Sequence, residues 1–309
     1  MIHRFERLNY RQVDSLRRDK TAIFIPISPL EEHGPHLPVG VDAFNAEYFA
    51  FSTAEKLQTL KPEWDIVIHP LLPVGAQVFK FIGSINLRQR VVRDLVSGVG
   101  SAFAIYGFKY IIVFSFHGGP RHIVALEEAC SRVSKKYDAR MISITGAIAE
   151  KFLSGGFIAD FEKEMGIEFT DQEKRLLSED IHAGWWETSM MLKIQPECVQ
   201  AGYKGLEPML VPYHQLGRKS SWSKGKGLGY FGAPHKASVE FSEASIRILD
   251  RIGLDIICRH LDGDDVSKEV TSRFYGMYIF RTEFKRILGL AVIIILLIMA
   301  FLIFGRFGW

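Results

Sequence analysis

The sequence predicts an α/β fold with one apolar helix near its C-terminal end. Two apolar runs, residues 21–27 and 109–116, have the length and composition of buried strands, and each leads into a glycine-containing loop that carries histidine. The second loop is followed by a helical stretch from about residue 123 to residue 136. Strand, loop and helix in this order are typical of α/β proteins, which place binding residues at the carboxyl ends of strands.

Length and composition agree with one catalytic domain and an appendage. The chain has 309 residues, 48% of them hydrophobic, which is enough for a large core in a single α/β domain. The net charge is only +3, and the basic residues are dispersed among 35 acidic ones, so we expect no nucleic-acid binding. Cys130, Cys198 and Cys258 have no paired or metal-type spacing, which favours a reducing compartment.

The loop after the first strand carries three strong metal ligands. Glu31, His33 and Asp42 fall within twelve residues, together with two prolines and two glycines. Proline and glycine exclude a regular helix here and allow the backbone to fold back on itself. We therefore expect the three side chains to converge, although a lone Glu-x-His pattern would more often be a polar surface turn.

Two later segments supply further ligand types. His117 begins the His-Gly-Gly turn after the second strand, and taken alone it could also be a buried histidine without a ligand role. His182 and Glu187 flank the expected start of a helix. Carboxylates and imidazoles from three such segments form a nitrogen and oxygen set that suits zinc or manganese.

Trp185 and Trp186 lie between the histidine and the carboxylate of the third segment. One of them could form an aromatic wall over a planar substrate. Adjacent residues on a helix point about 100° apart, so at most one of the two is expected in that position. The other is expected in the core.

The last part of the chain suggests a membrane anchor. A helix over about 242–261 closes the domain, an acidic turn follows, and residues 287–304 are eighteen residues without a charged or polar side chain. Such a helix is about 27 Å long, close to a bilayer core, and the alternative is a buried or oligomer-interface helix. Basic residues before the run outnumber the single Arg306 after it, which places the catalytic domain in the cytoplasm. No apolar signal region begins the chain.

The expected organisation is therefore a metal-binding domain over 1–262, a juxtamembrane linker over 263–286, a transmembrane helix over 287–304 and a short tail over 305–309. The membrane is one expected partner, through the C-terminal helix.

Four motifs in order and register resemble the creatininase family, also called creatinine amidohydrolases. The resemblance runs from about residue 5 to residue 260 and includes a Gly-Ala-Pro near its end. The motifs are residues 31–38 with Asp42, residues 81–87, residues 117–119, and residues 182–184 with 187–189.

The resemblance implies a three-layer α/β fold with a mainly parallel sheet flanked by helices. It also implies two divalent metal ions, zinc together with zinc, manganese or iron(II) in the second site, that serve the hydrolysis of an amide-type C–N bond. The residues at the family's ligand positions are Glu31, His33, Asp42, His117 and Glu187.

Individual roles follow from the same resemblance. Asp42 is similar to a bridging ligand, and Glu187 resembles a late acidic residue that either binds the second metal or lies beside it. His182 is similar to the histidine that handles a proton during ring opening. His182 and Glu187 are therefore the expected catalytic residues.

The chain departs from the family pattern at four positions. Creatininase itself has a glutamate ligand where this chain has Gly119, though many relatives carry glycine there. Pro120 and Ser115 stand where asparagine is frequent, and Trp185 stands where many relatives have a third acid. These changes leave the metal ligands intact but alter the substrate pocket.

The expected function is a metal-dependent amidohydrolase, tethered to the membrane, that acts on a small-molecule amide. Cyclic amide, formamide and peptide-like substrates remain open. The alternative is a non-catalytic, membrane-anchored interaction protein that keeps the fold. Family enzymes are often multimers, so a homo-oligomer is also open, subject to all anchors facing one bilayer.

Overall fold

A computed structural model of the chain describes residues 1–211 and 227–304. Its centre is a five-stranded sheet in which every pair of neighbouring strands is parallel. The strands, in spatial order, are β1 (Ile2–Arg4), β3 (Asp65–Ile68), β2 (Thr21–Pro26), β6 (Tyr110–Phe114) and β7 (Arg140–Ser143). A small second sheet pairs β4 (Gly75–Ala76) with β5 (Asn86–Leu87). The strands predicted over 21–27 and 109–116 are β2 and β6.

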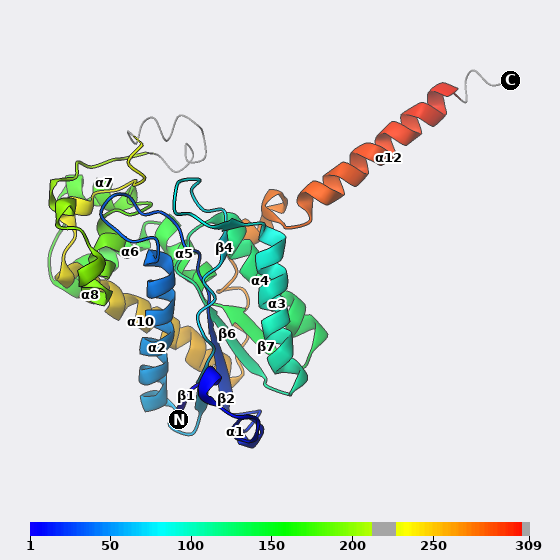
Figure 1. The fold of residues 1–309 in the computed structure, drawn as a ribbon, viewed down its shortest axis with the longest axis horizontal. Coiled ribbons are helices and arrows are strands. Elements are labelled where there is room, and N and C mark those ends of the chain that lie inside the picture. The colour runs from blue at the N-terminus through cyan, green and yellow to red at the C-terminus, as the bar shows by residue number, and fades with distance from the viewer. Residues whose placement is uncertain (212–226, 305–309) are drawn as a thin grey trace.

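Helices cover both faces of the sheet (Figure 1). The longest are α2 (Val41–Leu60) and α10 (Val239–Asp262) on one face and α3 (Gln89–Ile105) and α4 (Pro120–Lys136) on the other. Shorter helices pack around α10 or lie at the edges: α1 (Tyr10–Ser15), α5 (Thr145–Leu153), α6 (Gly156–Met165), α7 (Asp171–Ser178) and α8 (Trp185–Ile194). Short 3-10 turns span Phe5–Arg7, Pro196–Cys198, Ala201–Gly205 and Pro234–Lys236.

Side-chain alternation along the strands explains the two covered faces. In β2, Ala22 and Phe24 belong to the core under α2 and α10, whereas Ile23 and Ile25 belong to the core under α3 and α4. Successive residues of a strand point to opposite faces, so a strand that is apolar throughout must be buried on both. The predicted α/β fold with a parallel sheet between helices is confirmed.

The strand order brings the loops of the candidate site together. β2 and β6 are neighbours in register, with Pro26 opposite Phe114, and the Ile27 N–H donates to the Phe114 carbonyl at 2.8 Å. The loops that leave these two strands therefore start side by side at the carboxyl edge of the sheet, where open α/β sheets bind ligands.

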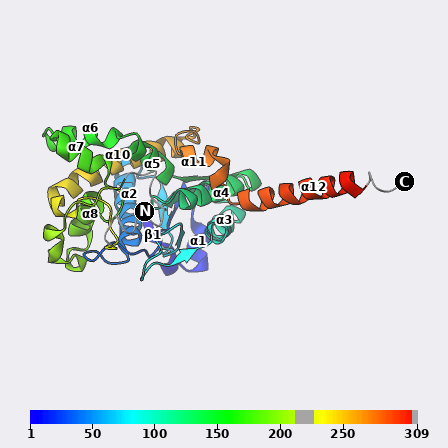
Figure 2. The same ribbon diagram turned by 90° about the horizontal axis from the view of Figure 1, so that it is seen from above.

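The chain after α10 first packs against the body and then leaves it. It forms α11 (Arg273–Gly276) and η6 (Tyr278–Phe280), and then α12 (Phe284–Phe304), which runs away from the domain in both views (Figures 1 and 2). Most of the described side chains of α12 are exposed, Leu297 by 64%.

The expectation of a transmembrane helix over 287–304 is not supported. A span needs about 20 consecutive apolar residues, and within residues 1–211 and 227–304 no helix is both long and apolar enough to cross a bilayer. The membrane attachment and the cytoplasmic placement of the domain rested on that helix and lose their support with it. The tail expected over 305–309 lies outside the described residues.

Candidate metal centre

The loop between β2 and α2 holds the first two candidate ligands in place. The Glu31 N–H donates to the Val39 carbonyl at 2.9 Å, which closes the loop, and Gly34 turns the chain at a φ of +69°. Glycine adopts this left-handed conformation without steric cost. α2 then begins at Val41 and places Asp42 in its first turn, where the aligned peptide dipoles favour a carboxylate.

One group of ligand-type atoms joins this loop to the turn after β6. Glu31, Asp42 and His117 each offer an atom within 4.8 Å of the others, and all three side chains are buried. His117 Nδ1 lies 3.1 Å from Glu31 Oε2 and 3.2 Å from Asp42 Oδ2. Two carboxylates and one imidazole therefore face a common point.

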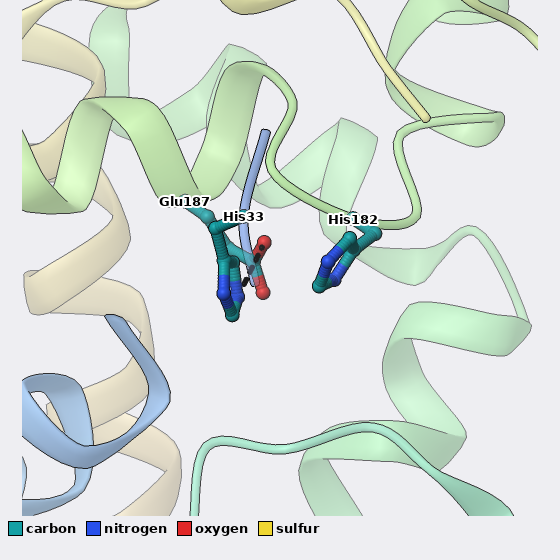
Figure 3. Close-up of side chains that lie close together, drawn as sticks. All are labelled: His33, His182 and Glu187. Carbon is teal, nitrogen blue, oxygen red and sulfur yellow. Dashed lines mark ion pairs between the residues drawn. The ribbon is translucent and has the colours of Figure 1, made fainter. Parts of the chain in front are cut away.

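A second group joins the same loop to the start of α8. Figure 3 shows the Glu187 carboxylate beside the His33 ring, with His182 opposite on the loop that precedes α8. His33 Nε2 lies 3.5 Å from Glu187 Oε2, and the His33 and His182 rings are 4.2 Å apart. Asp42 Oδ1 lies 3.6 Å from His33 Nε2. Asp42 thus directs one oxygen toward each group.

Backbone carbonyls fix which nitrogen of each imidazole faces the carboxylates. His33 Nδ1 donates to the Glu31 carbonyl at 3.0 Å, and His117 Nε2 donates to the Ala76 carbonyl at 3.2 Å. In a neutral ring the other nitrogen carries a lone pair. His33 Nε2 and His117 Nδ1 therefore direct lone pairs toward carboxylate oxygens. Such an arrangement is typical of metal-binding histidines, whose other nitrogen is held by an acceptor.

Unpaired polar atoms mark the same place. Among the described residues, Glu31 Oε2, His33 Nε2 and Asp42 Oδ2 are buried and have no hydrogen-bond partner. Buried polar atoms are nearly always paired, so unpaired carboxylate oxygens beside imidazole nitrogens need an explanation. Cations between them would satisfy all three atoms, and the residues present therefore fit a pair of divalent ions.

The electrostatics of the site favour bound positive charge. Burial by itself lowers the pKa of His33 and of His117, yet nearby carboxylates raise both well above the usual value, Glu187 and Asp42 for His33 and Glu31 and Asp42 for His117. Burial raises the pKa of Asp42, but the two histidines outweigh it and hold that pKa below its usual range. The Asp42 carboxylate is therefore ionised and available as a ligand.

A buried aspartate that the sequence did not single out positions the third segment. Asp180 accepts hydrogen bonds from the backbone N–H groups of Trp185 at 2.7 Å, Trp186 at 2.8 Å and Ala233 at 3.3 Å. Burial raises its pKa to about 7 against the effect of these donors. A Cβ on Gly184 or Gly232 would lie 1.8 or 2.0 Å from Asp180 Oδ1, so both glycines permit the contact.

We expect Asp180→Ala to lower the free energy of unfolding by about 3 kcal/mol, because three buried backbone donors lose their acceptor at about 1–3 kcal/mol each before relaxation. Urea denaturation measures the change. Asp171→Ala, at an exposed position in the first turn of α7, is the control and should stay within about 1 kcal/mol of wild type. Equal losses in the two variants would contradict the role of Asp180.

The backbone at the start of α8 is also unusual. Ala183 has a φ of +50°, which is costly for a residue with a Cβ. Its N–H donates to Glu187 Oε2 at 2.5 Å, so this conformation fixes the carboxylate that faces His33. Strain of this kind is concentrated at functional sites.

Both groups open onto a cavity of about 470 Å³. His117, His182 and Glu187 are among the residues that line it. Trp186 lines it too, whereas Trp185 packs in the core against Phe241, with the ring centroids 5.1 Å apart. Only one of the two tryptophans faces the cavity, as their spacing on a helix predicts.

Comparison with known proteins agrees with this geometry. A family model described as creatinine amidohydrolase, or creatininase, matches residues 6–251. The chain belongs to the creatininase family. Its members' fold is also seen in a solved structure named "Creatininase Mn", with a TM-score of 0.65 at 15% identity over 84% of this chain and 99% of that one.

Two curated relatives that match this chain in sequence carry a different name from creatininase. A "Mycofactocin precursor peptide peptidase" of Mycobacterium ulcerans is 27% identical over 184 residues, which are 58% of this chain and 60% of the relative. The protein of the same name from Mycobacterium tuberculosis is 26% identical over 230 residues, 70% of this chain and 76% of the relative. The chain thus spans about three fifths of the first relative's length.

The family description and the names of the relatives are those of hydrolases that act on amide-type bonds. The family therefore favours the enzyme over the non-catalytic interaction protein that the sequence left open. The structure brings together all the residues that the family resemblance singled out, which are Glu31, His33, Asp42, His117, His182 and Glu187.

Proposed function

We propose that the protein hydrolyses an amide bond with two divalent ions, one held by Glu31, Asp42 and His117 and the other by His33, Asp42 and Glu187. The observation that carries this proposal is the position of Asp42, whose two carboxylate oxygens face the two groups at 3.2 and 3.6 Å. A carboxylate shared in this way is the usual bridge of a two-metal site.

Glu187 takes the place of the ligand that creatininase has at the position of Gly119. A Cβ on Gly119 would lie 2.5 Å from His117 Nε2, so no side chain fits there while His117 holds its position. Glu187 reaches the same region from α8 and faces His33 at 3.5 Å. It therefore completes the second metal site rather than lying beside it.

When bound, the ions would lower the pKa of a bound water toward about 7 and polarise the amide carbonyl. His182 would move the proton. Its Nε2 donates to the Glu32 carbonyl at 2.7 Å, which leaves Nδ1 as the acceptor nitrogen. Burial lowers the pKa of His182, so the ring is neutral and Nδ1 can take a proton and pass it to the leaving nitrogen.

A peptide-like amide is the substrate class that we favour over creatinine. The relatives that match over most of this chain are named as peptidases of a precursor peptide. The cavity of about 470 Å³ falls within the range of about 300–1,000 Å³ that pockets for drug-sized ligands have. For the metals, carboxylate and imidazole ligands fit zinc in one site and zinc, manganese or iron(II) in the other.

We expect Glu187→Ala to reduce the metal content from about two ions to about one per chain, because only the second group loses a ligand. Activity should fall by more than about 100-fold, since changes to residues that merely support ligands already cost about 10- to 100-fold. Elemental analysis gives the metal content. Glu240→Ala, in the first turn of α10 as Glu187 is in that of α8, is the control. Two retained ions would place Glu187 outside the metal site.

A chelation experiment tests the activity itself. Protein stripped with a chelator is assayed on creatinine, formamides and short peptides, before and after zinc or manganese is restored. We expect hydrolysis only after metal is restored, with peptide-like amides cleaved fastest. Hydrolysis that survives chelation, or none on any amide with metal restored, would contradict the proposed function.

A further inference from the structure

Part of the cavity wall comes from a region beyond the family match. Phe274 in α11 and Phe280 in η6 both line the cavity, and the match to the creatininase family ends at residue 251. We call residues 264–283 the C-terminal segment. A portion of the chain that the family pattern does not cover thus contributes to the site where the amide is proposed to bind.

Buried contacts hold the first part of the C-terminal segment against the domain. Glu127 of α4 accepts from the Ser272 N–H at 2.6 Å and from the Ser272 hydroxyl at 3.1 Å, and both residues are buried. A Cβ on Gly146 would lie 2.2 Å from the Val270 carbonyl oxygen. The segment therefore approaches the start of α5 as closely as a glycine allows.

A second set of contacts holds the end of the C-terminal segment against the domain. The Gln89 side chain donates to the Phe280 carbonyl at 2.7 Å, and the Thr282 N–H donates to Glu128 at 3.2 Å. Arg93, only 2% exposed, pairs with Glu283 at 2.9 Å. The segment is fixed at both ends, so the two aromatic rings are held in place before any ligand binds.

The wall that the segment builds is apolar. Phe274 and Phe280 contact each other edge to face, with ring centroids 5.4 Å apart and an interplanar angle of 73°. Phe152 and Leu153 of α5 continue the lining, and none of the lining residues from α5, α11 and η6 is charged. The ligand-type residues of the lining lie instead in the two segments around His117 and His182. The cavity is polar where the metal ligands lie and apolar along this wall.

We propose that the C-terminal segment determines substrate specificity: Phe274 and Phe280 bind a bulky apolar group, preferably aromatic, attached next to the scissile amide. This inference rests on the proposed function, because the amide must reach the metal centre for its substituent to reach the wall. A small polar cyclic amide would leave the aromatic wall in contact with water and gain nothing from it. An apolar substituent would gain the free energy of its burial.

Metal-chelating probes with and without an aromatic group test the inference by binding alone. Isothermal titration of the zinc-supplemented full chain compares acetohydroxamate with phenylacetohydroxamate, whose ring lies on the acyl side, and with N-benzylacetohydroxamate, whose ring lies on the nitrogen side. We expect one of the benzyl compounds to bind at least about 10-fold more tightly than acetohydroxamate, because a phenyl-sized group is removed from water.

Two aromatic variants and one control locate the effect. Phe280→Ala should reduce the advantage of that benzyl compound about 3- to 10-fold and leave acetohydroxamate unchanged. Phe274→Ala should do the same, and the half-buried Phe280 gives the variant that disturbs the core less. Tyr278→Ala, at a 54% exposed aromatic of the same segment that does not line the cavity, should change neither affinity.

Equal binding of all three hydroxamates, or a benzyl advantage that survives in both phenylalanine variants, would overturn the specificity role. Failure of acetohydroxamate to bind zinc-supplemented protein would instead overturn the metal centre. In that case titration with phenylacetamide, which does not chelate metal, tests the specificity role alone. Weaker binding of phenylacetamide to Phe280→Ala than to Tyr278→Ala would support this role, and equal binding would contradict it.

Discussion

Asp42→Asn is expected to remove both metal ions and to lower activity by well over 100-fold. The substitution replaces one carboxylate oxygen by an NH₂ group, which cannot bind a metal and would point at one of the two candidate ion positions. Asp42 also faces both groups of ligands, with Oδ2 at 3.2 Å from His117 and Oδ1 at 3.6 Å from His33. Loss of a shared ligand weakens both metal sites. The effect should therefore exceed the loss of about 10- to 100-fold in metal affinity or activity that follows mutation of residues that only support ligands.

Metal-to-protein ratios after purification without chelators, and activity measured on the same samples, check this prediction. Asp138→Asn is the matched control, because the side chain of Asp138 is 93% exposed and pairs with Lys109 on the surface. The control should keep the wild-type ratio and rate. Wild-type metal content in Asp42→Asn would show that the carboxylate is not a shared ligand.

His182→Ala is expected to keep its metal and to lose turnover by about 10²- to 10⁴-fold, the usual contribution of a general acid or base. The Nε2 of His182 is occupied by the Glu32 carbonyl, and its Nδ1 is left to exchange protons with the substrate. The variant should therefore lower kcat more than it raises KM.

Two other outcomes of this variant would each contradict that role. Because a ring nitrogen of His182 lies within 4.8 Å of ligand atoms of His33 and Glu187, loss of one ion would show that His182 is itself a ligand. A normal rate with normal metal would show that it is structural. His69→Ala, outside the cavity at the end of β3, is the control and should leave rate and metal unchanged.

The sequence predicted the parts of the site that depend on residue type and chain order. Glu31, His33 and Asp42 follow an apolar strand in a loop rich in proline and glycine, and His117 follows a second apolar strand. The convergence of these segments depends on β2 and β6 being parallel neighbours, which periodicity alone does not determine and which the structure supplies.

Other features depend on contacts between residues far apart in the chain. Asp180 precedes a helix like many solvent-exposed aspartates, and its importance comes partly from Ala233, fifty-three residues later. The region after residue 262 was expected as a linker, yet Ser272 bonds to Glu127, 145 residues earlier. The apolar run over 287–304 predicted a helix, and α12 is present, but the step from apolar helix to membrane span is not supported.

Anomalous diffraction from crystals grown with manganese or zinc tests the central claim most directly. The proposed function predicts two anomalous peaks per chain, one among Glu31, Asp42 and His117 and the other among His33, Asp42 and Glu187, with Asp42 contacting both. A single peak, or two peaks that do not share Asp42, would contradict the account.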